Sequence, residues 1–214
     1  MNPDPDWIAR RLIPLSTARP CDALSPAPDY DLDFDPALSF SPAAVLVGLA
    51  PARDGLSVLL TRRSDALRRH TGQIALPGGR CEGEDCTPER TALREAEEEI
   101  GLDSARVEIL GRLPDYLTST GYSVTPVVGW AEPPLAYRPD PHEVADVFEV
   151  PLGFLLDPGN HRYESAFYKG RMRHYWAMPY GERFIWGATA GMLVTFQRIL
   201  TLSPALPQGG GRTA

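Results

Sequence analysis

Residues 88–102 read PERTALREAEEEIGL, and they contain the clearest element of regular structure in the chain. Thr87 can cap the first turn of a helix, Pro88 suits its first position, and Gly101 can end it. The stretch therefore predicts a helix over residues 88–100. Five of the fifteen residues are glutamates, so this helix carries a high density of negative charge.

The spacing of the glutamates predicts where that charge lies. An α-helix advances about 100° per residue, so Glu95, Glu98 and Glu99 fall on one face. Like charges at this spacing destabilise a helix by about 0.2–0.5 kcal/mol per pair. Arg94 can pair with Glu98 but cannot neutralise three carboxylates. Taken alone, such a helix is best explained as a solvated acidic face, although its oxygen atoms also suit a hard cation such as Mg²⁺ or Mn²⁺.

The composition limits the class of protein. The chain has 214 residues, of which 43% are hydrophobic, and this is enough for one well-buried core. Its formal net charge of −7 argues against broad electrostatic binding to nucleic acid or to an anionic membrane, so we expect a small-molecule ligand. The three cysteines form no even disulfide framework, and neither a secretory signal nor a transmembrane stretch is recognisable. These features predict a cytoplasmic protein and leave its oligomeric state open.

The pattern along the chain divides it into three parts. Residues 1–42 predict a short amphipathic helix, within residues 3–13, and an irregular connector rich in Pro and Asp that packs on the domain. Residues 43–202 predict a single domain, and residues 203–214 predict a mobile tail.

Within the domain, apolar runs predict the order of the elements. Strands are expected at residues 43–50, 56–63, 73–76, 106–116, 122–131 and 147–152. A hairpin around Lys169-Gly170 is expected at residues 167–180, and apolar residues at helical intervals predict a core-packing helix at residues 182–200.

Residues 94–102 resemble the signature of the Nudix hydrolases, a box of the form G-x5-E-x7-R-E-U-x-E-E-x-G-U in which U is a bulky aliphatic residue. The second half matches as REAEEEIGL, with an alanine at the first U position. The first half departs, because Gly79 lies one residue too far from Arg94 and Cys86 stands where the box has its earlier glutamate. Either Glu84 or Asp85 can substitute for that glutamate.

This resemblance implies a fold, an activity and a set of site residues. The implied fold is an α/β/α sandwich with a mixed central sheet, and the implied activity is that of a pyrophosphatase. Glu95, Glu98, Glu99 and the carbonyl of Gly79 are implied to hold Mg²⁺ or Mn²⁺ between the enzyme and the pyrophosphate. We expect Arg94 to orient the neighbouring carboxylates, because arginine forms fixed charge-assisted pairs.

The segment upstream of the box narrows the resemblance. Residues 59–79, LLTRRSDALRRHTGQIALPGG, resemble the motif L-L-T-x-R-S-x3-R-x3-G-x3-F-P-G-G of the coenzyme A pyrophosphatase branch, with Leu76 in place of the phenylalanine. That branch commonly has the same extra residue in its box. The likeness implies hydrolysis of the coenzyme A diphosphate to 3′,5′-ADP and 4′-phosphopantetheine. Arg63 and Arg68 match the motif, and arginine suits the phosphates of such a substrate.

One further acid is a candidate for the site. Glu143 lies in PDPHEVADVFEVPL, just before a predicted strand, and Nudix enzymes often take a metal-binding or water-activating glutamate from such a loop. An ordinary solvated loop acid is an equal alternative, and Glu95 competes for the role of general base.

Two other functions stay open from the sequence. One is a Nudix hydrolase of another nucleoside diphosphate derivative, such as ADP-ribose or a dinucleotide. The other is a non-catalytic Nudix-fold binding module, which would be expected to lack one or more of the three glutamates on the shared face.

Overall fold

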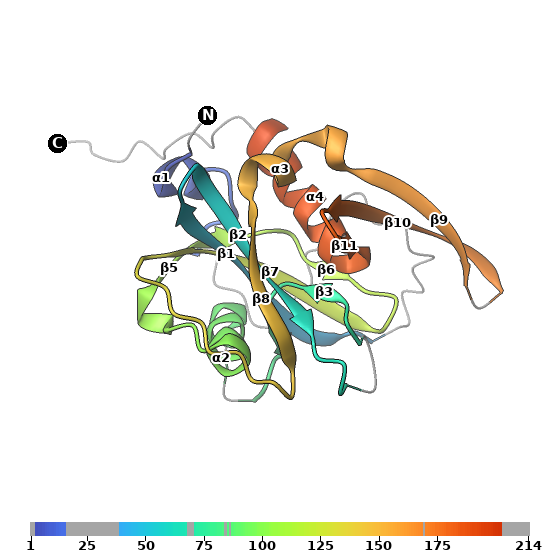
Figure 1. The fold of residues 1–214 in the computed structure, drawn as a ribbon, viewed down its shortest axis with the longest axis horizontal. Coiled ribbons are helices and arrows are strands. Elements are labelled where there is room, and N and C mark those ends of the chain that lie inside the picture. Colours follow the sequence, from blue (N-terminus) through green and yellow to red (C-terminus); the bar gives the residue numbers. More distant parts are fainter. Residues whose placement is uncertain are drawn as a thin grey trace.

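A mixed β-sheet forms the centre of the computed structural model, which describes residues 3–15, 39–67, 71–83, 85, 87–168 and 170–202 (Figure 1). The strands of this sheet are β1 (Ser41–Ala52), β2 (Gly55–Arg63), β3 (Ile74–Ala75), β4 (Gly78–Arg80), β5 (Val107–Arg112), β6 (Tyr116–Leu117), β7 (Tyr122–Ala131) and β8 (Val144–Pro151). The main path runs β3-β2-β1-β7-β5, while β4 pairs with β1, β6 with β7 and β8 with β2. Strands β1 and β7 are parallel and the other pairs are antiparallel, so the sheet is mixed as predicted.

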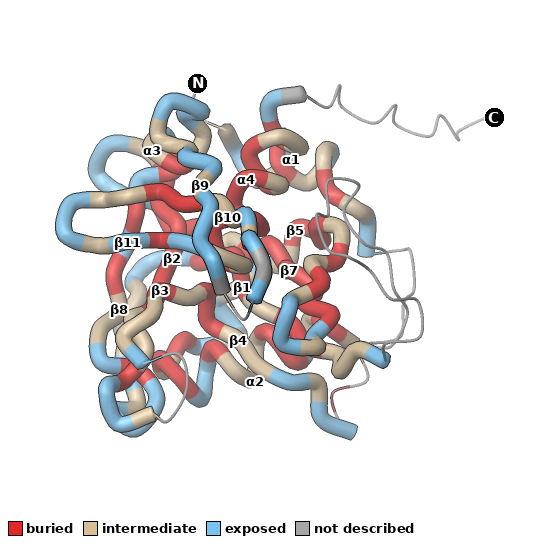
Figure 2. The backbone as a smooth tube through the Cα atoms, turned by 90° about the vertical axis from the view of Figure 1, so that its right-hand side faces the viewer, coloured by how far each residue is buried: buried red, intermediate tan, exposed pale blue. Residues whose placement is uncertain are grey.

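Helices cover both faces of the sheet (Figure 1). Helix α2 (Pro88–Ile100) packs on one face through a cluster that includes Ala92, Ala96 and Ile100. Helices α3 (Leu152–Leu156) and α4 (Gly187–Leu202) pack on the other face through a larger apolar cluster. Strands β1 and β2 are covered on both sides, and most of their residues are buried (Figure 2). The predicted α/β/α sandwich is therefore confirmed.

A second, smaller sheet corrects one prediction. It consists of β9 (Arg162–Tyr168), β10 (Arg171–Tyr180) and β11 (Arg183–Trp186), in the order β11-β10-β9. The predicted helix over residues 182–200 was wrong at its start, because residues 183–186 form β11 and the helix begins at Gly187. Pairing with β10 decides this difference: Ile185 lies opposite Met178 and is buried, while the residues on either side of it are exposed.

The N-terminal segment packs against the edge of the central sheet. Helix α1 (Pro5–Ala9) lies beside β5 within the predicted helical range, and Ile8 and Leu12 are buried. Ile13 forms an isolated antiparallel bridge with Arg112. The predicted connector falls mostly on residues 16–38, which lie outside the described residues, as does the predicted tail at 203–214.

Two short 3₁₀ turns complete the elements, η1 (Ser104–Arg106) and η2 (Pro158–Asn160). Within the described ranges, no helix has the length and apolar character needed to cross a membrane.

Candidate active site

The site begins at the Gly-Gly turn that follows β3. Strand β4 pairs antiparallel with β1, so that Gly78 lies opposite Val45 and Gly79 lies opposite Ala44. Gly78 has a φ of +151°, and a Cβ atom there would lie 2.5 Å from the Cα of Val45. A side chain at position 78 would therefore clash with the backbone of β1. Because Gly78 and Gly79 have no side chains, the backbone of the turn lies directly against the inner face of α2.

Glu95 lies directly on this backbone. A Cβ atom built on Gly79 would lie 2.5 Å from each oxygen of the Glu95 carboxylate, so a side chain at position 79 would displace the carboxylate from its present position. Helix α2 holds Glu95 in place because its ends are capped as predicted. The Thr87 side chain accepts from the backbone N–H of Arg90, and Gly101 ends the helix in the left-handed conformation.

Glu99 is the most buried acid of the helix, with 4% of its surface exposed. Its Oε2 accepts a hydrogen bond of 3.1 Å from the backbone N–H of Gly78, and its Oε1 lies 3.9 Å from Nη1 of Arg63. Burial raises the pKa of Glu99 from 4.5 to about 7, against the opposing effects of Gly78 and Arg63. A cation bound beside Glu99 would stabilise the ionised carboxylate and so offset the effect of burial on its pKa.

Arg63 reaches the site through an irregularity in the sheet. The register between β2 and β8 shifts between Arg62 and Arg63, and such bulges re-aim side chains. Arg63 Nε is buried and has no hydrogen-bond partner within the described ranges. Arg68 lies outside the described residues, so its predicted role as a substrate ligand stays a prediction.

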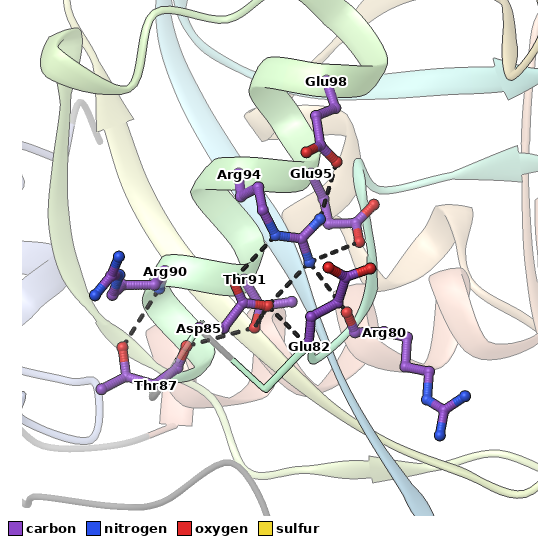
Figure 3. A network of polar contacts seen from close by, with 9 residues as sticks. All are labelled: Arg80, Glu82, Asp85, Thr87, Arg90, Thr91, Arg94, Glu95 and Glu98. Atoms are coloured by element: carbon purple, nitrogen blue, oxygen red, sulfur yellow. Dashed lines mark hydrogen bonds and ion pairs between the residues drawn. The ribbon is translucent and has the colours of Figure 1, made fainter.

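Arg94 forms a network with the surrounding carboxylates (Figure 3). Its Nη1 lies 2.9 Å from Oε2 of Glu98, and its Nη2 lies 3.0 Å from Oε1 of Glu95. The same guanidinium donates to both oxygens of Asp85. Of the two alternatives to the missing box glutamate, Asp85 therefore pairs with Arg94, while Glu84 lies outside the described residues. The sequence alone left this choice open because it did not show which side chain turns toward α2.

Glu143 lies near the same site but belongs to a different loop. It ends the turn before β8, and its carbonyl accepts a hydrogen bond of 2.8 Å from the backbone N–H of Ser64, at the end of β2. The Ser64 hydroxyl donates to the carbonyl of Pro141, so two hydrogen bonds tie this turn to the upstream motif. The charge of Glu143 raises the pKa of both Glu95 and Glu99. Its exposed side chain therefore belongs to the same electrostatic site.

The predicted metal ligands are only partly assembled. Glu95, Glu99 and Gly79 lie together, whereas 60% of the Glu98 side chain is exposed and its oxygen is held by Arg94. In the part of the chain that the structure describes, no three His, Cys, Asp or Glu side chains form a ready metal-binding group. The guanidinium of Arg94 lies between Glu95 and Glu98 and occupies their oxygens.

The donor set nevertheless fits a hard divalent cation. It consists of carboxylate oxygens beside a glycine backbone, and such oxygens are the ligands that Mg²⁺ and Mn²⁺ prefer. Burial raises the pKa of Glu95 and of Glu99 by more than the neighbouring arginines lower it, so an added cation would favour the charged form of both carboxylates. The roles of Glu95, Glu98, Glu99 and Gly79 as metal ligands stay predictions.

Comparison with known proteins identifies sequence relatives. A family model described as NUDIX domain matches residues 40–169. A protein named "Uncharacterized Nudix hydrolase NudL" from Escherichia coli strain K12 is 42% identical over 156 residues, which cover 73% of this chain and 81% of that protein. The protein of the same name from Shigella boydii serotype 18 matches with the same identity and coverage.

Solved structures show a weaker likeness. A Caenorhabditis elegans Ap4A hydrolase, in a binary complex, has a TM-score of 0.46 and 20% identity over 52% of this chain and 80% of that chain. The NUDIX domain of Shewanella oneidensis NrtR, complexed with ADP ribose, has a TM-score of 0.42 and 24% identity over 58% of this chain and 82% of that chain. At TM-scores below 0.5 these likenesses carry no argument about activity.

Proposed function

The chain belongs to the Nudix hydrolase family, and from that premise we propose that it hydrolyses the diphosphate linkage of coenzyme A or its derivatives to 3′,5′-ADP and 4′-phosphopantetheine. As a Nudix hydrolase it is an enzyme that acts on nucleoside diphosphate derivatives. The assignment to coenzyme A, and the cytoplasmic localisation predicted from the sequence, are parts of the proposal.

The observation that carries the proposal is the position of the upstream motif. Arg63 of the motif lies 3.9 Å from Glu99 on the acidic helix. Ser64 of the motif holds the turn that contains Glu143. Gly78 and Gly79, at the end of the motif, contact Glu99 and Glu95. The residues that resemble the coenzyme A branch thus surround the carboxylates that would carry the chemistry.

The position of Arg63 supports a role at the diphosphate. Its Nη1 lies 3.9 Å from Glu99 Oε1, too far for a hydrogen bond, and the side chain is partly exposed, so this end of the guanidinium retains a donor for an anion. Arginine binds phosphate through paired hydrogen bonds. Because Arg63 stands beside the proposed metal ligands, we assign it to the diphosphate and leave the 3′-phosphate to Arg68.

The remaining residues have distinct proposed roles. Glu95, Glu98, Glu99 and the carbonyl of Gly79 would hold Mg²⁺ or Mn²⁺, which supplies positive charge against the diphosphate oxygens and lowers the pKa of water. Glu143 faces these residues from an exposed turn, where its carboxylate can accept a proton from the attacking water. Water adds to one phosphorus and the bridging P–O bond breaks, so no covalent enzyme intermediate is needed.

A substrate panel tests the proposal. Purified enzyme is incubated with Mg²⁺ or Mn²⁺ and with coenzyme A, ADP-ribose or a dinucleotide, and the products are separated. We expect the highest kcat/KM with coenzyme A, and no turnover by Glu99→Gln assayed in parallel. Hydrolysis of ADP-ribose or a dinucleotide with coenzyme A left intact would refute the substrate assignment. Binding of coenzyme A without hydrolysis of any of these compounds would favour the binding module instead.

A further inference from the structure

We propose that the outer edge of the smaller sheet is a self-association surface. Strand β9 pairs there with β9 of a second copy of the chain, in antiparallel orientation, so that two three-stranded sheets join into one. The two-fold axis of this dimer passes between the Ser165 residues of the two copies. The proposal goes beyond the catalytic site and does not depend on the identity of the substrate.

Strand β9 is an edge strand without the usual protection against pairing. Strand β10 pairs with one side of it, and no described residue pairs with its other side. Natural proteins block such edges with lysine, proline or a bulge. Between Arg162 and Tyr168 the strand has no lysine or proline, and its register with β10 is regular throughout. The hairpin of β9 and β10 projects from the body of the protein, with β9 outermost (Figure 1). Within the described part of the molecule, this edge is therefore accessible to a second strand.

One face of the hairpin exposes large apolar side chains. Phe167 lies opposite Met172, and Tyr163 lies opposite Trp176. Because these residues alternate along the two strands, they share a face of the sheet. The exposed fractions are 72% for Phe167, 56% for Met172 and 52% for Tyr163. At the base of the hairpin Trp176 packs against the main apolar cluster, whereas toward the turn the face is left exposed.

Pairing about Ser165 brings these exposed residues together. In an antiparallel pair centred on Ser165, Tyr163 of one copy lies opposite Phe167 of the second copy. Trp176 extends this row on β10 of the first copy, and Met172 extends it on β10 of the second copy. Side chains directly opposite each other have Cβ atoms about 4.5–5.5 Å apart, so the row is in contact across the axis. Each copy therefore covers apolar surface that the other exposes.

The other face of the hairpin has complementary charges in the same register. Glu164 lies opposite Ala166 of the second copy, and Ala166 lies opposite Arg173 on its own β10. Glu164 and Arg173 of the second copy are thus about 10 Å apart, or two strand spacings, with only an alanine side chain between them. Both side chains are long enough to meet over the alanine. Arg173 has no ion pair within the described ranges, and the two-fold axis forms the new pair twice.

The charges also select the register. Pairing about Glu164 would set two like charges directly opposite each other, which destabilises a strand pair. Pairing about Ser165 instead sets serine opposite serine. The pattern of apolar and charged residues therefore favours a second copy of this chain, in one register, as the partner of this edge.

Sedimentation equilibrium of the full chain tests whether the dimer exists. One strand pair gives a small isologous interface, and interfaces that bury less than roughly 1,200 Å² are weak or transient. We therefore expect the mean mass to rise from that of a monomer toward that of a dimer between about 1 µM and about 200 µM protein. A monomer mass over the whole range would overturn the proposal.

Two charge reversals locate the interface. Glu164→Arg and Arg173→Glu each place like charges at both contacts, so each should raise the dissociation constant of the dimer by at least about tenfold. A mixture of the two variants, one of them fluorescently labelled, has opposite charges at both contacts. We expect it to form a heterodimer with a dissociation constant within about threefold of wild type. Glu182→Arg is the matched control, because it makes the same charge change in the exposed turn between β10 and β11 and should dimerise like wild type.

The mixture separates contact between copies from a defect within one copy, because a variant with a damaged fold would not regain association when mixed. A dimer that survives both reversals unchanged would overturn the proposal. A mixture that associates no better than its components would also overturn it.

Cysteine substitution tests the register and decides the question even if a charge variant does not fold. The Ser165 residues face each other at a Cα separation of about 4.5–5.5 Å, which permits a disulfide. The Ala166 residues of the two copies lie diagonally, at about 7–8 Å, which does not. On oxidation, Ser165→Cys should form a cross-linked dimer, whereas Ala166→Cys and wild type with its three native cysteines should not. Equal cross-linking of the two variants would refute pairing about Ser165.

Discussion

Glu99→Gln is expected to make the metal-free protein more stable at alkaline pH while it removes activity. Burial raises the pKa of Glu99 from 4.5 to about 7, and the charges of Glu95 and Glu143 add to this effect. A group whose pKa is raised in the folded state contributes stability that is fully present below the unfolded pKa, near 4.5, and is lost as the pH rises through about 7. The metal-free protein therefore bears the cost of an ionised, buried carboxylate above pH 7.

The size of the effect follows from the pKa shift. The shift from 4.5 to about 7 corresponds to roughly 3 kcal/mol at about 1.4 kcal/mol per pH unit. Glutamine keeps the shape of the side chain and can still accept from the N–H of Gly78, but it carries no charge at any pH. The variant should therefore exceed wild type by roughly 3 kcal/mol in unfolding free energy at pH 8, and should be close to wild type at pH 4.5.

Urea unfolding in EDTA at pH 4.5 and at pH 8 measures both differences. Glu97→Gln serves as the control, because Glu97 is exposed and its replacement should change the free energy of unfolding little at either pH. Addition of Mg²⁺ at pH 8 should stabilise wild type and not Glu99→Gln, because a ligand stabilises only the folded state that binds it. If the stability gained by Glu99→Gln were the same at both pH values, a raised pKa could not be its cause, and the reasoning would be refuted.

Three further predictions concern activity. Glu98→Gln should remove most of the turnover without loss of fold, because it deletes one ligand charge from an exposed side chain; near wild-type rates with Mg²⁺ would contradict the metal site. Arg63→Ala should lower kcat/KM by about 10- to 100-fold, and equally for coenzyme A and dephospho-coenzyme A. Arg68→Ala should lower kcat/KM more strongly for coenzyme A than for dephospho-coenzyme A. Parallel kinetics on the two substrates measure both differences. If Glu143 is the general base, Glu143→Gln should lower kcat and flatten the acidic limb of the pH–rate profile. If Glu143 is a metal ligand, the variant should need more metal for half-maximal rate and keep the acidic limb. An unchanged kcat and an unchanged metal requirement would show that Glu143 is an ordinary solvated acid.

The sequence of this chain was most informative where structure depends on near neighbours. The caps and the acidic face of α2 depend on residues within four positions of one another, so Thr87, Gly101 and the glutamate spacing predicted the helix at its observed bounds. The segment 183–186 lacked such local determinants. Its apolar spacing was compatible with a helix, and only the available edge of β10 made it a strand.

The sequence by itself determined that three carboxylates share a helix face beside a Gly-Gly turn, and with the family signature this led to a diphosphate hydrolase. Only the tertiary structure decided which residues join them. Arg63 and Glu143 are far apart in the sequence, and pairing of β2 with β8 brings them to the same end of the sheet. The partner of Arg94 likewise depended on how the chain before α2 turns. Spacing along a helix is set by covalent geometry, whereas contacts between strands and loops depend on the packing of the whole core.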